Sequence, residues 1–327
     1  MRNLSVQFPK EGGYVRAVDG LDLDIFPGEI LGVVGESGCG KSVTALSVLR
    51  LLPPRSSVTK GTILFDAEDL IGMDQQELRG LRGGKIGMIF QEPMTSLNPV
   101  MTVGDQIEEA IQLHDGGSRR EVRQRAVELL GLVKIPDAET RLRHYPHQFS
   151  GGMRQRIMIA MALACRPKLL IADEPTTALD VTIQAQILKL MLDLKDATGA
   201  AVMMITHDLG VVAETCQRVV VMYAGQKMEE ASVLDLFDRP SHPYTRGLML
   251  SRPARDHGEA GGRLLEIPGS VPTLQAPPLG CVFAPRCSFR TERCGSQKPE
   301  LRSVDQHHIV ACHEAEKVRA SALRPLS

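Results

Sequence analysis

Over its first 230 residues, the chain alternates short apolar runs with helix-like segments. A run of four or five apolar residues bounded by turn residues is typical of a buried strand. Such runs predict strands at Ile30–Val34, Ile86–Phe90, Leu169–Ala172, Val202–Ile205 and Val219–Met222. The segment Lys41–Leu52 predicts a helix that stops at Pro53 and Pro54. This alternation of strands and helices predicts an α/β domain.

Between Glu92 and Phe149 the pattern becomes mainly helical. Ser118 followed by Glu121 matches a capping box, in which each residue satisfies a backbone N–H at the start of a helix. Apolar residues then recur at helical spacing at Val122, Ala126, Leu129, Leu130 and Val133. We interpret this stripe as core packing. The pattern therefore predicts a helical subdomain, about residues 92–158, inserted into the α/β domain.

The composition changes after about residue 230. Prolines accumulate between Pro240 and Pro285, and Asp256–Gly262 is expected to be an exposed linker. Few regular elements are predicted in this part. Since 327 residues are too many for one ordinary core, we expect a large domain over residues 1–230 and a small loop-rich domain over residues 231–327.

Charge and composition narrow the class of protein. The 38 basic and 39 acidic residues nearly cancel, which argues against a nucleic-acid partner. The sequence has neither an apolar run of about 18 residues nor a signal peptide. We therefore expect a cytoplasmic protein, in which disulfides are rare. Four of its seven cysteines fall between Cys281 and Cys312, and such a cluster in a reducing compartment points first to a metal.

A glycine-rich segment after the first apolar run predicts a phosphate site. Gly35–Ser42 matches G-x-x-x-x-G-K-[ST] between a predicted strand and a predicted helix. The glycines let backbone N–H groups point at phosphate oxygens. Lys41 is expected to reach the β- and γ-phosphates of ATP, and the Ser42 hydroxyl to bind Mg²⁺. The predicted nucleotide-binding set is Gly35, Ser37, Gly38, Cys39, Gly40, Lys41, Ser42 and Val43.

Two carboxylates end another predicted strand. Asp173 and Glu174 follow the apolar run that begins at Leu169. Ligands of open parallel sheets bind at the carboxyl ends of the strands. Asp173 is expected to hold Mg²⁺ directly or through water, and Glu174 to polarise the attacking water.

The segment Phe149–Gln155 resembles the L-S-G-G-Q signature of ABC-family ATPases, with Phe and Met at its first and fifth positions. The resemblance implies that Ser150, Gly151 and Gly152 bind the ATP of a facing subunit. It also implies that Gln91 is the Q-loop glutamine, which touches Mg²⁺ or water. These residues lie in the order that the family uses, so the resemblance implies a P-loop NTPase with a RecA-like core, an antiparallel β edge and an inserted helical subdomain.

Three further roles follow from the same resemblance. Asp180 is similar to the D-loop residue at the dimer interface. His207 is similar to the switch histidine that contacts the γ-phosphate, and the catalytic set is therefore Glu174, His207 and Gln91. Tyr14 is the candidate for stacking on adenine, with Phe8 as its rival, and either could be a packing residue.

The chain further resembles the ATPases of oligopeptide and dipeptide importers. The resemblance rests on the phosphate loop, on Phe90–Pro99, on His242-Pro243-Tyr244-Thr245 and on the cysteine-rich tail. Cys281, Cys287, Cys294 and Cys312 are spaced C-x5-C-x6-C-x17-C, and four thiolates can hold zinc or an iron–sulfur cluster. Relatives with such a tail bind a 4Fe–4S cluster, which the resemblance carries over to these four cysteines. Zinc, a competing ligand at His313, and unliganded thiols are the alternatives.

The resemblance implies the partners. They are a second ABC ATPase subunit, forming a heterodimer, two integral membrane permease subunits and an extracytoplasmic substrate-binding protein. The location implied is the cytoplasmic face of the inner membrane. Importers of nickel, glutathione or opine-like solutes share these motifs, and a soluble ABC ATPase is the alternative from another class. Met1–Phe8 resembles a first strand with few residues before it, which is consistent with a start codon placed late.

Overall fold

The computed structural model describes residues 1–53, 57–91, 96–177, 179–251, 267–272, 275–276 and 278–321, with the side chains of residues 57–59 left aside. These residues form two compact units. The first unit contains residues 1–24, 31–71 and 206–327, and the second contains residues 25–30 and 72–205. The predicted phosphate loop and the cysteine-rich tail therefore belong to the same unit, whereas the predicted carboxylate pair belongs to the other.

The first unit begins with a three-stranded antiparallel sheet in the order β2-β1-β4. Its strands are β1 (Arg2–Lys10), β2 (Gly13–Leu21) and β4 (Ser57–Thr62). Leu4 and Val6 on β1 and Val18 and Leu21 on β2 are fully buried, so this sheet has one apolar face. The antiparallel β edge that the resemblance implied is thus present. A two-stranded hairpin follows, formed by β5 (Leu64–Phe65) and β6 (Glu68–Asp69).

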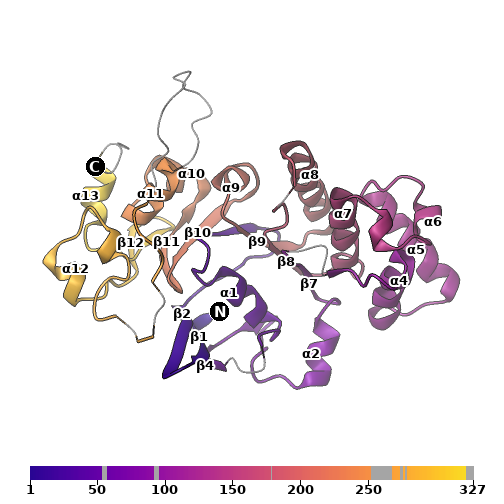
Figure 1. Cartoon of the computed structure of the whole chain (residues 1–327), viewed down its shortest axis with the longest axis horizontal. Helices are drawn as coiled ribbons and strands as arrows, with labels where there is room; N and C mark the ends of the chain where they lie inside the picture. Colours follow the sequence, from indigo (N-terminus) through magenta and orange to yellow (C-terminus); the bar gives the residue numbers. More distant parts are fainter. Residues whose placement is uncertain are drawn as a thin grey trace. The chain divides into compact units, whose positions relative to one another are not determined.

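A second set of strands in this unit has the order β12-β13-β11-β10-β3. Strand β3 (Ile30–Val34) pairs in parallel with β10 (Arg218–Tyr223), and the remaining neighbours are antiparallel. These neighbours are β11 (Gln226–Ser232), β13 (His308–Val310) and β12 (Arg302–Asp305). Residues from the C-terminal part of the chain therefore extend the same sheet that carries the phosphate loop (Figure 1).

Short helices complete the first unit. They are α1 (Lys41–Val48), α9 (Leu209–Thr215), α10 (Val233–Asp238), α11 (Pro243–Leu250), the 3-10 turn η2 (Ala284–Arg286), α12 (Glu292–Ser296) and α13 (Ala315–Ala320). The prediction of few regular elements after residue 230 was wrong. Ser232 and His242 cap α10 and α11 through their side chains, and Pro243 occupies the first turn of α11. A proline there starts a helix, because the first N–H groups of a helix need no partner within it.

The second unit holds three parallel strands in the order β9-β8-β7. They are β7 (Ile86–Ile89), β8 (Leu169–Asp173) and β9 (Ala201–Thr206). Each lies within about one residue of the apolar run that predicted it. Every residue of β9 is buried, as expected of a parallel strand with both faces covered.

The predicted helical insertion is present in the second unit. Its elements are α4 (Val103–His114), α5 (Arg119–Leu132), α6 (Ala138–Arg141), the 3-10 turn η1 (Pro146–Gln148) and α7 (Gly151–Ala162), which runs past the predicted end at about residue 158. Two further helices of this unit, α2 (Gln75–Leu81) and α8 (Val181–Thr198), lie outside the predicted insertion. Helices α4, α5 and α7 contact one another (Figure 1). The predicted capping box at Ser118 and Glu121 forms, and the predicted apolar stripe on α5 is buried.

Three outcomes qualify the predicted boundaries. The helix that begins at Lys41 ends at Val48 rather than Leu52, because Arg50 adopts a left-handed conformation with φ of 49°. The predicted linker Asp256–Gly262 and the predicted start of the insertion at Glu92 lie outside the described residues.

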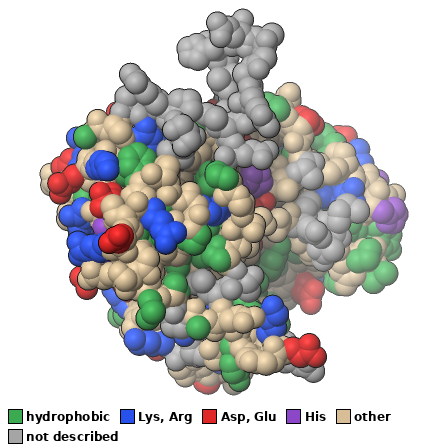
Figure 2. Space-filling model, turned by 60° about the vertical axis from the view of Figure 1, so that its left-hand side comes forward, with side chains coloured by type: hydrophobic (Ala, Val, Ile, Leu, Met, Phe, Trp, Pro, Cys, Tyr) green, Lys and Arg blue, Asp and Glu red, His purple; other side chains and the backbone are tan. Residues whose placement is uncertain are grey.

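On the face drawn in Figure 2, basic and acidic side chains are intermingled, in agreement with the formal net charge of −1.

Candidate nucleotide-binding and cysteine sites

The phosphate loop joins β3 to α1, and its glycines stand where a side chain would not fit. A Cβ on Gly35 would lie 2.2 Å from the Met222 carbonyl oxygen, and one on Gly40 would lie 2.4 Å from the Ala17 carbonyl oxygen. Gly40 also has a φ of 102°, a conformation that glycine adopts without strain. These close approaches fix the loop against β10 and β2, so the glycines of the motif serve the packing of the loop as well as its curvature.

Lys41 is almost fully buried, and its ammonium group lies inside the loop. Its Nζ donates to the carbonyl oxygens of Gly35 at 2.7 Å and Glu36 at 3.0 Å. The loop is closed further by a bond from the Cys39 N–H to the Glu36 carbonyl at 3.3 Å. Lys41 is thus placed at the centre of the loop by short contacts, as a phosphate-binding lysine requires.

The remaining predicted loop residues are more accessible. Ser37 and Gly38 are exposed, and Ser42 and Val43 at the start of α1 are partly buried. Cys39 is buried, and burial raises the pKa of its thiol. This cysteine therefore remains a neutral thiol near pH 7 and adds no charge to an anion site.

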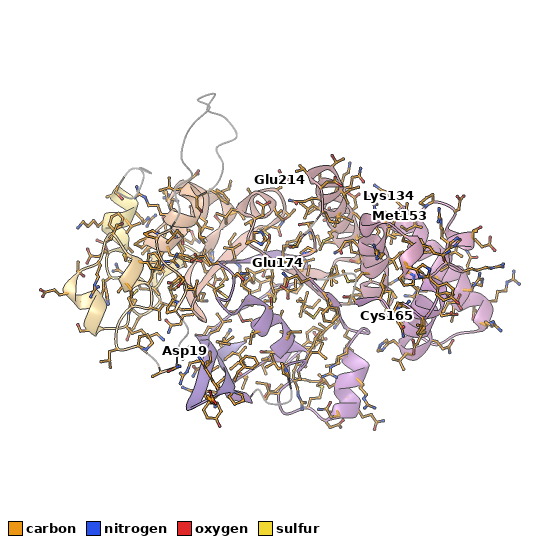
Figure 3. All side chains as sticks on the ribbon, viewed as in Figure 1. Asp19, Lys134, Met153, Cys165, Glu174 and Glu214 are labelled. Carbon is orange, nitrogen blue, oxygen red and sulfur yellow. The ribbon has the colours of Figure 1, made fainter. Side chains whose placement is uncertain are left out.

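The predicted carboxylate pair ends β8 in the second unit (Figure 3). Asp173 is only 5% exposed, whereas Glu174 is partly accessible. Glu174 has a left-handed backbone with φ of 47°, which is uncommon for a residue with a side chain. Strained backbone of this kind is found preferentially at functional sites.

The structure brings two members of the predicted catalytic set together. The Gln91 Nε2 donates to Glu174 Oε2 at 3.2 Å, although 83 residues separate them in the chain. The Thr177 hydroxyl donates to the same oxygen at 2.8 Å. A carboxylate that accepts from two neutral donors is held in one orientation, which suits a group that must accept a hydrogen bond from water.

The signature segment opens α7. Ser150 caps this helix, with its hydroxyl accepting from the Met153 N–H at 3.4 Å. Met153, in the first turn of α7, is labelled in Figure 3. Ser150 and Gly151 are exposed. A Cβ on Gly152 would lie 2.8 Å from the Ile183 Cγ2 of α8, so glycine permits close helix packing at this position. The exposed, capped N-terminus of this 12-residue helix can receive an anion.

Sequence reasoning missed Gln155, which links two of the motifs. This residue is 2% exposed, and its Nε2 donates to the Pro175 carbonyl oxygen at 2.6 Å. The signature helix is thereby tied to the residue that follows Glu174. A buried amide needs partners, but the sequence does not show that this glutamine is buried, so no local signal pointed to the bond.

The other predicted residues differ in how exposed they are. Asp180 is exposed and caps α8 by accepting from the Ile183 N–H at 2.9 Å. His207 follows β9 directly and is exposed. Tyr14 lies on β2 with 53% of its surface exposed, whereas its rival Phe8 on β1 is partly buried. Tyr14 is therefore the more accessible of the two aromatic candidates.

The four clustered cysteines line one cavity in the first unit. Its lining includes Cys281, Cys287, Cys294 and Cys312 together with His242 and Phe283. All four cysteines are free thiols. Burial raises the pKa of Cys287 to about 11 and that of Cys312 to about 12. Within the part of the chain that the structure describes, no group of three or more His, Cys, Asp or Glu side chains is arranged to hold a metal ion.

The polar surroundings of this cavity bear on what it could bind. His242 is fully buried, and its Nδ1 accepts from the Tyr244 N–H at 3.0 Å. The ring proton therefore sits on Nε2, which has no hydrogen-bond partner among the described residues. Four thiols thus line the cavity, whereas the protonated Nε2 of His242 is a hydrogen-bond donor and cannot itself bind a metal ion.

Comparisons with known protein families agree with the motifs. The family described as ABC transporter matches residues 18–177. The family described as oligopeptide/dipeptide transporter, C-terminal region, matches residues 228–294. The first match contains the phosphate loop, the signature and the carboxylate pair, and the second contains three of the four clustered cysteines.

Similar proteins and solved structures cover most of the chain. A probable peptide ABC transporter ATP-binding protein of Sinorhizobium fredii is 57% identical over 97% of this chain and 95% of its own. A dipeptide transport ATP-binding protein of Bacillus subtilis is 52% identical over 95% of this chain and 93% of its own. A dimeric ATP-binding cassette solved in a post-hydrolysis state with ADP and phosphate is 30% identical, with a TM-score of 0.64 over 71% of this chain and 97% of that one. The chain therefore belongs to the ATP-hydrolysing, ATP-binding subunits of ABC transporters, in the oligopeptide/dipeptide importer family.

Proposed function

We propose that this chain hydrolyses ATP to power the import of dipeptides and oligopeptides. The observation that carries the proposal is one chain with both an ABC ATPase region and the C-terminal region of oligopeptide/dipeptide transporters. Several relatives that are at least half identical over nearly the whole chain carry peptide-transport names. We assign the ATPase region to residues 1–230 and the extension to residues 231–327.

Different groups in and around the phosphate loop would bind the phosphates, the Mg²⁺ ion and the adenine of ATP. Lys41 and the backbone N–H groups from Gly35 to Val43 would bind the phosphates, because they form a curled, positively charged loop. Ser42 and Asp173 would hold Mg²⁺ through oxygen, the ligand that this ion prefers. Tyr14 would stack on adenine, which its exposure allows.

The groups at the end of β8 support the hydrolytic step. Glu174 would accept a hydrogen bond from the attacking water, and Gln91, which already donates to Glu174, would reach the same water or Mg²⁺. His207 would contact the γ-phosphate. These residues would promote hydrolysis by positioning the attacking water and stabilising the charge on the transferred phosphoryl group, as in other phosphoryl transfers.

The exposed signature supports a dimer. Ser150, Gly151 and Gly152 would bind the ATP held by a second ATPase subunit, with Asp180 at the interface between the two. Among the described helices, none is long and apolar enough to cross a membrane. Two permease subunits would therefore supply the pathway at the cytoplasmic face of the inner membrane, and an extracytoplasmic binding protein would deliver the cargo.

The cysteine cavity supports a 4Fe–4S cluster held by Cys281, Cys287, Cys294 and Cys312. Such a cluster would cross-link four points of the extension and stabilise it. Burial raises the pKa of Cys287 and Cys312, and these thiols would have to lose their protons to bind the cluster. Zinc is the competing occupant, because four thiolates also satisfy its tetrahedral preference.

Metal analysis of anaerobically purified protein tests the cluster. Iron and sulfide near four per chain are expected, and Cys287→Ser should lower both and the melting temperature. Cys165→Ser is the matched control, since Cys165 lies in the other unit. Zinc near one per chain without iron would replace the cluster by a structural zinc site, and the absence of all three elements would overturn the metal proposal.

Uptake by the assembled transporter tests the cargo. Proteoliposomes with the chain and its partner subunits should take up a radiolabelled dipeptide when ATP is present, and unlabelled oligopeptides should compete. Nickel, glutathione and an opine serve as alternative cargoes in the same vesicles. Uptake of one of these with no uptake of peptide would refute the peptide proposal. Failure of the chain to sediment with membranes that contain the permeases would favour a soluble ATPase.

A further inference from the structure

The second residue of the phosphate loop is held by the C-terminal extension. Arg286 Nη1 donates to Glu36 Oε2 at 2.7 Å, and Arg286 Nη2 donates to Glu36 Oε1 at 3.0 Å. The Glu36 N–H donates to the Tyr244 hydroxyl oxygen at 2.8 Å. Both the side chain and the backbone of Glu36 are thus bound by residues that lie more than 200 positions later in the chain.

Arg286 is itself fixed in place. Its side chain is 5% exposed, and its guanidinium lies 5.6 Å from the centre of the Tyr223 ring. Its Nε donates to the Pro268 carbonyl at 2.7 Å, and Nη2 also donates to the Ile267 carbonyl at 2.9 Å. A planar guanidinium with this many partners presents a two-pronged donor in one orientation, which a lysine could not reproduce.

The charge of Glu36 makes this contact relevant to ATP. The loop binds polyphosphate, yet Glu36 places a carboxylate within it, next to the carbonyl oxygens on which Lys41 rests. An unpaired carboxylate would repel the phosphates and compete for Lys41. The bidentate pair with Arg286 neutralises this charge and engages both carboxylate oxygens, while Lys41 donates to backbone carbonyls.

We propose that Arg286, supported by Tyr244, is a positioning residue of the extension that holds Glu36 so that the phosphate loop can bind ATP. The proposal rests on the ATPase activity of the family and does not depend on the cargo. In this arrangement the extension contributes directly to the affinity for ATP, in addition to any structural role that it has in the subunit.

Steady-state ATPase assays on the assembled transporter test this proposal. Arg286→Ala should raise KM for ATP about tenfold, the effect of one uncompensated charge at roughly 10 Å in a partly screened site. The expected change in kcat is smaller, because Arg286 touches no group of the hydrolytic step. Arg286→Lys should restore part of the affinity, since it returns the charge without the fork.

A double variant separates positioning from general stability. Adding Glu36→Gln to Arg286→Ala removes the unpaired carboxylate and should return KM most of the way toward the wild-type value. Arg319→Ala is the matched control. Arg319 is another extension arginine, 20% exposed, which binds the Val304 carbonyl and Asp305 away from the loop. It should lower the melting temperature without raising KM.

Three results would overturn the proposal: an unchanged KM in Arg286→Ala, a raised KM that Glu36→Gln does not reverse, or an equal rise in Arg319→Ala. None of these would affect the peptide proposal, because the readout is ATP. Conversely, a transporter that proves to carry another cargo would leave the predicted KM pattern in place.

Discussion

Replacing Glu229 with glutamine should destabilise the first unit by about 3 kcal/mol. Glu229 on β11 is fully buried and accepts three hydrogen bonds. They come from the Ser241 N–H at 2.6 Å, the His242 N–H at 2.9 Å and His308 Nε2 at 2.7 Å. The carboxylate thus ties β11 to the start of α11 and to β13.

The magnitude follows from the donors that remain. In Glu229→Gln the amide oxygen can replace one carboxylate oxygen, but the NH₂ group must then face a backbone N–H donor. The unsatisfied donor costs about 1–3 kcal/mol, and each remaining bond weakens because the acceptor has lost its charge. Neutralising a buried charge also relieves a desolvation cost. We expect the loss to exceed this relief, because all three donors are fixed by their own elements and cannot turn toward other acceptors.

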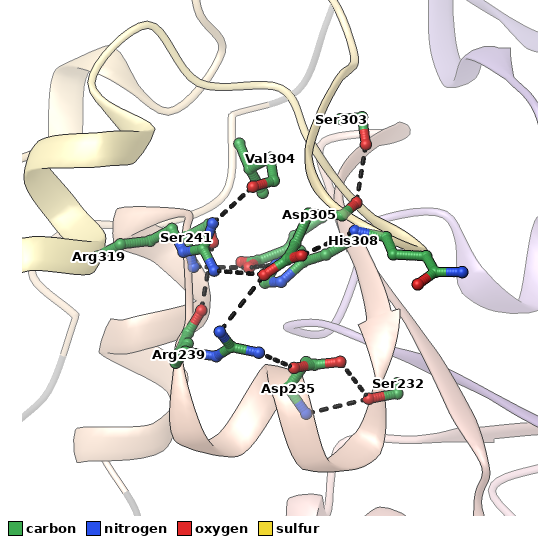
Figure 4. A network of polar contacts seen from close by, with 11 residues as sticks. Ser232, Asp235, Arg239, Ser241, Ser303, Val304, Asp305, His308 and Arg319 are labelled. Carbon is green, nitrogen blue, oxygen red and sulfur yellow. Dashed lines mark hydrogen bonds and ion pairs between the residues drawn. The ribbon is translucent and has the colours of Figure 1, made fainter.

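Thermal unfolding of the full chain provides the assay. A loss of about 3 kcal/mol should lower the melting temperature by about 6 °C, at roughly 2 °C per kcal/mol for a large chain. Asp305→Asn is the matched carboxylate-to-amide control in the neighbouring surface network (Figure 4). Asp305 is 43% exposed and pairs with Arg239 and Arg319, and such surface pairs contribute about 0–1 kcal/mol. If Glu229→Gln lowers the melting temperature no more than Asp305→Asn does, the reasoning about fixed donors is refuted.

Two further predictions address the site, and a third addresses the pH dependence of stability. Glu174→Gln should leave ATP binding intact and lower ATP turnover by about 10²-fold or more, because it removes the group that accepts the proton of water; a single-turnover assay with normal hydrolysis would exclude this role. Gly35→Ala should abolish ATP binding in equilibrium titrations, since its Cβ would overlap the Met222 carbonyl; retained affinity would show that the loop can move aside. Burial opposes ionisation of Asp19, but the Arg16 hydrogen bond, the Lys298 charge and the Gln226 hydrogen bond outweigh it and lower the pKa of Asp19 below 3.8. Asp19→Asn should therefore cost stability at pH 7, and the difference from wild type should shrink as the pH falls below 3.8, where denaturant titrations at several pH values would detect it.

The sequence predicted the elements that are determined by residues close together in the chain. Apolar runs located β3, β7, β8, β9 and β10, because a strand buried on both faces needs consecutive apolar residues. The capping box at Ser118 could also be predicted, because both of its hydrogen bonds join residues three positions apart. The phosphate loop was predicted with its context because its glycines, lysine and serine are contiguous.

The long-range polar contacts could not be predicted in this way. Arg286 and Glu36 lie 250 positions apart, and His308 and Glu229 lie 79 apart. A single arginine or glutamate looks the same in sequence whether it is solvated or paired in the core, and only the completed fold decides. The helices of the extension were missed for a different reason, because the accumulation of prolines was taken to favour irregular structure, although Pro243 and Pro285 each lie in the first turn of a helix.

The contacts of the phosphate loop differ in what they demand of the sequence. Its approaches to Ala17 and Met222 and its bond from the Gly225 N–H to the Cys39 carbonyl at 2.9 Å involve backbone atoms. These contacts require small residues in the loop but no particular partner side chain. The contacts to Glu36, in contrast, depend on the side chains of Arg286 and Tyr244, and both come from the extension. Substitutions in the extension can therefore change the affinity for ATP through Glu36, while the backbone contacts keep the loop in its conformation. The affinity of the ATP site can thus change without a change in the fold of the phosphate loop.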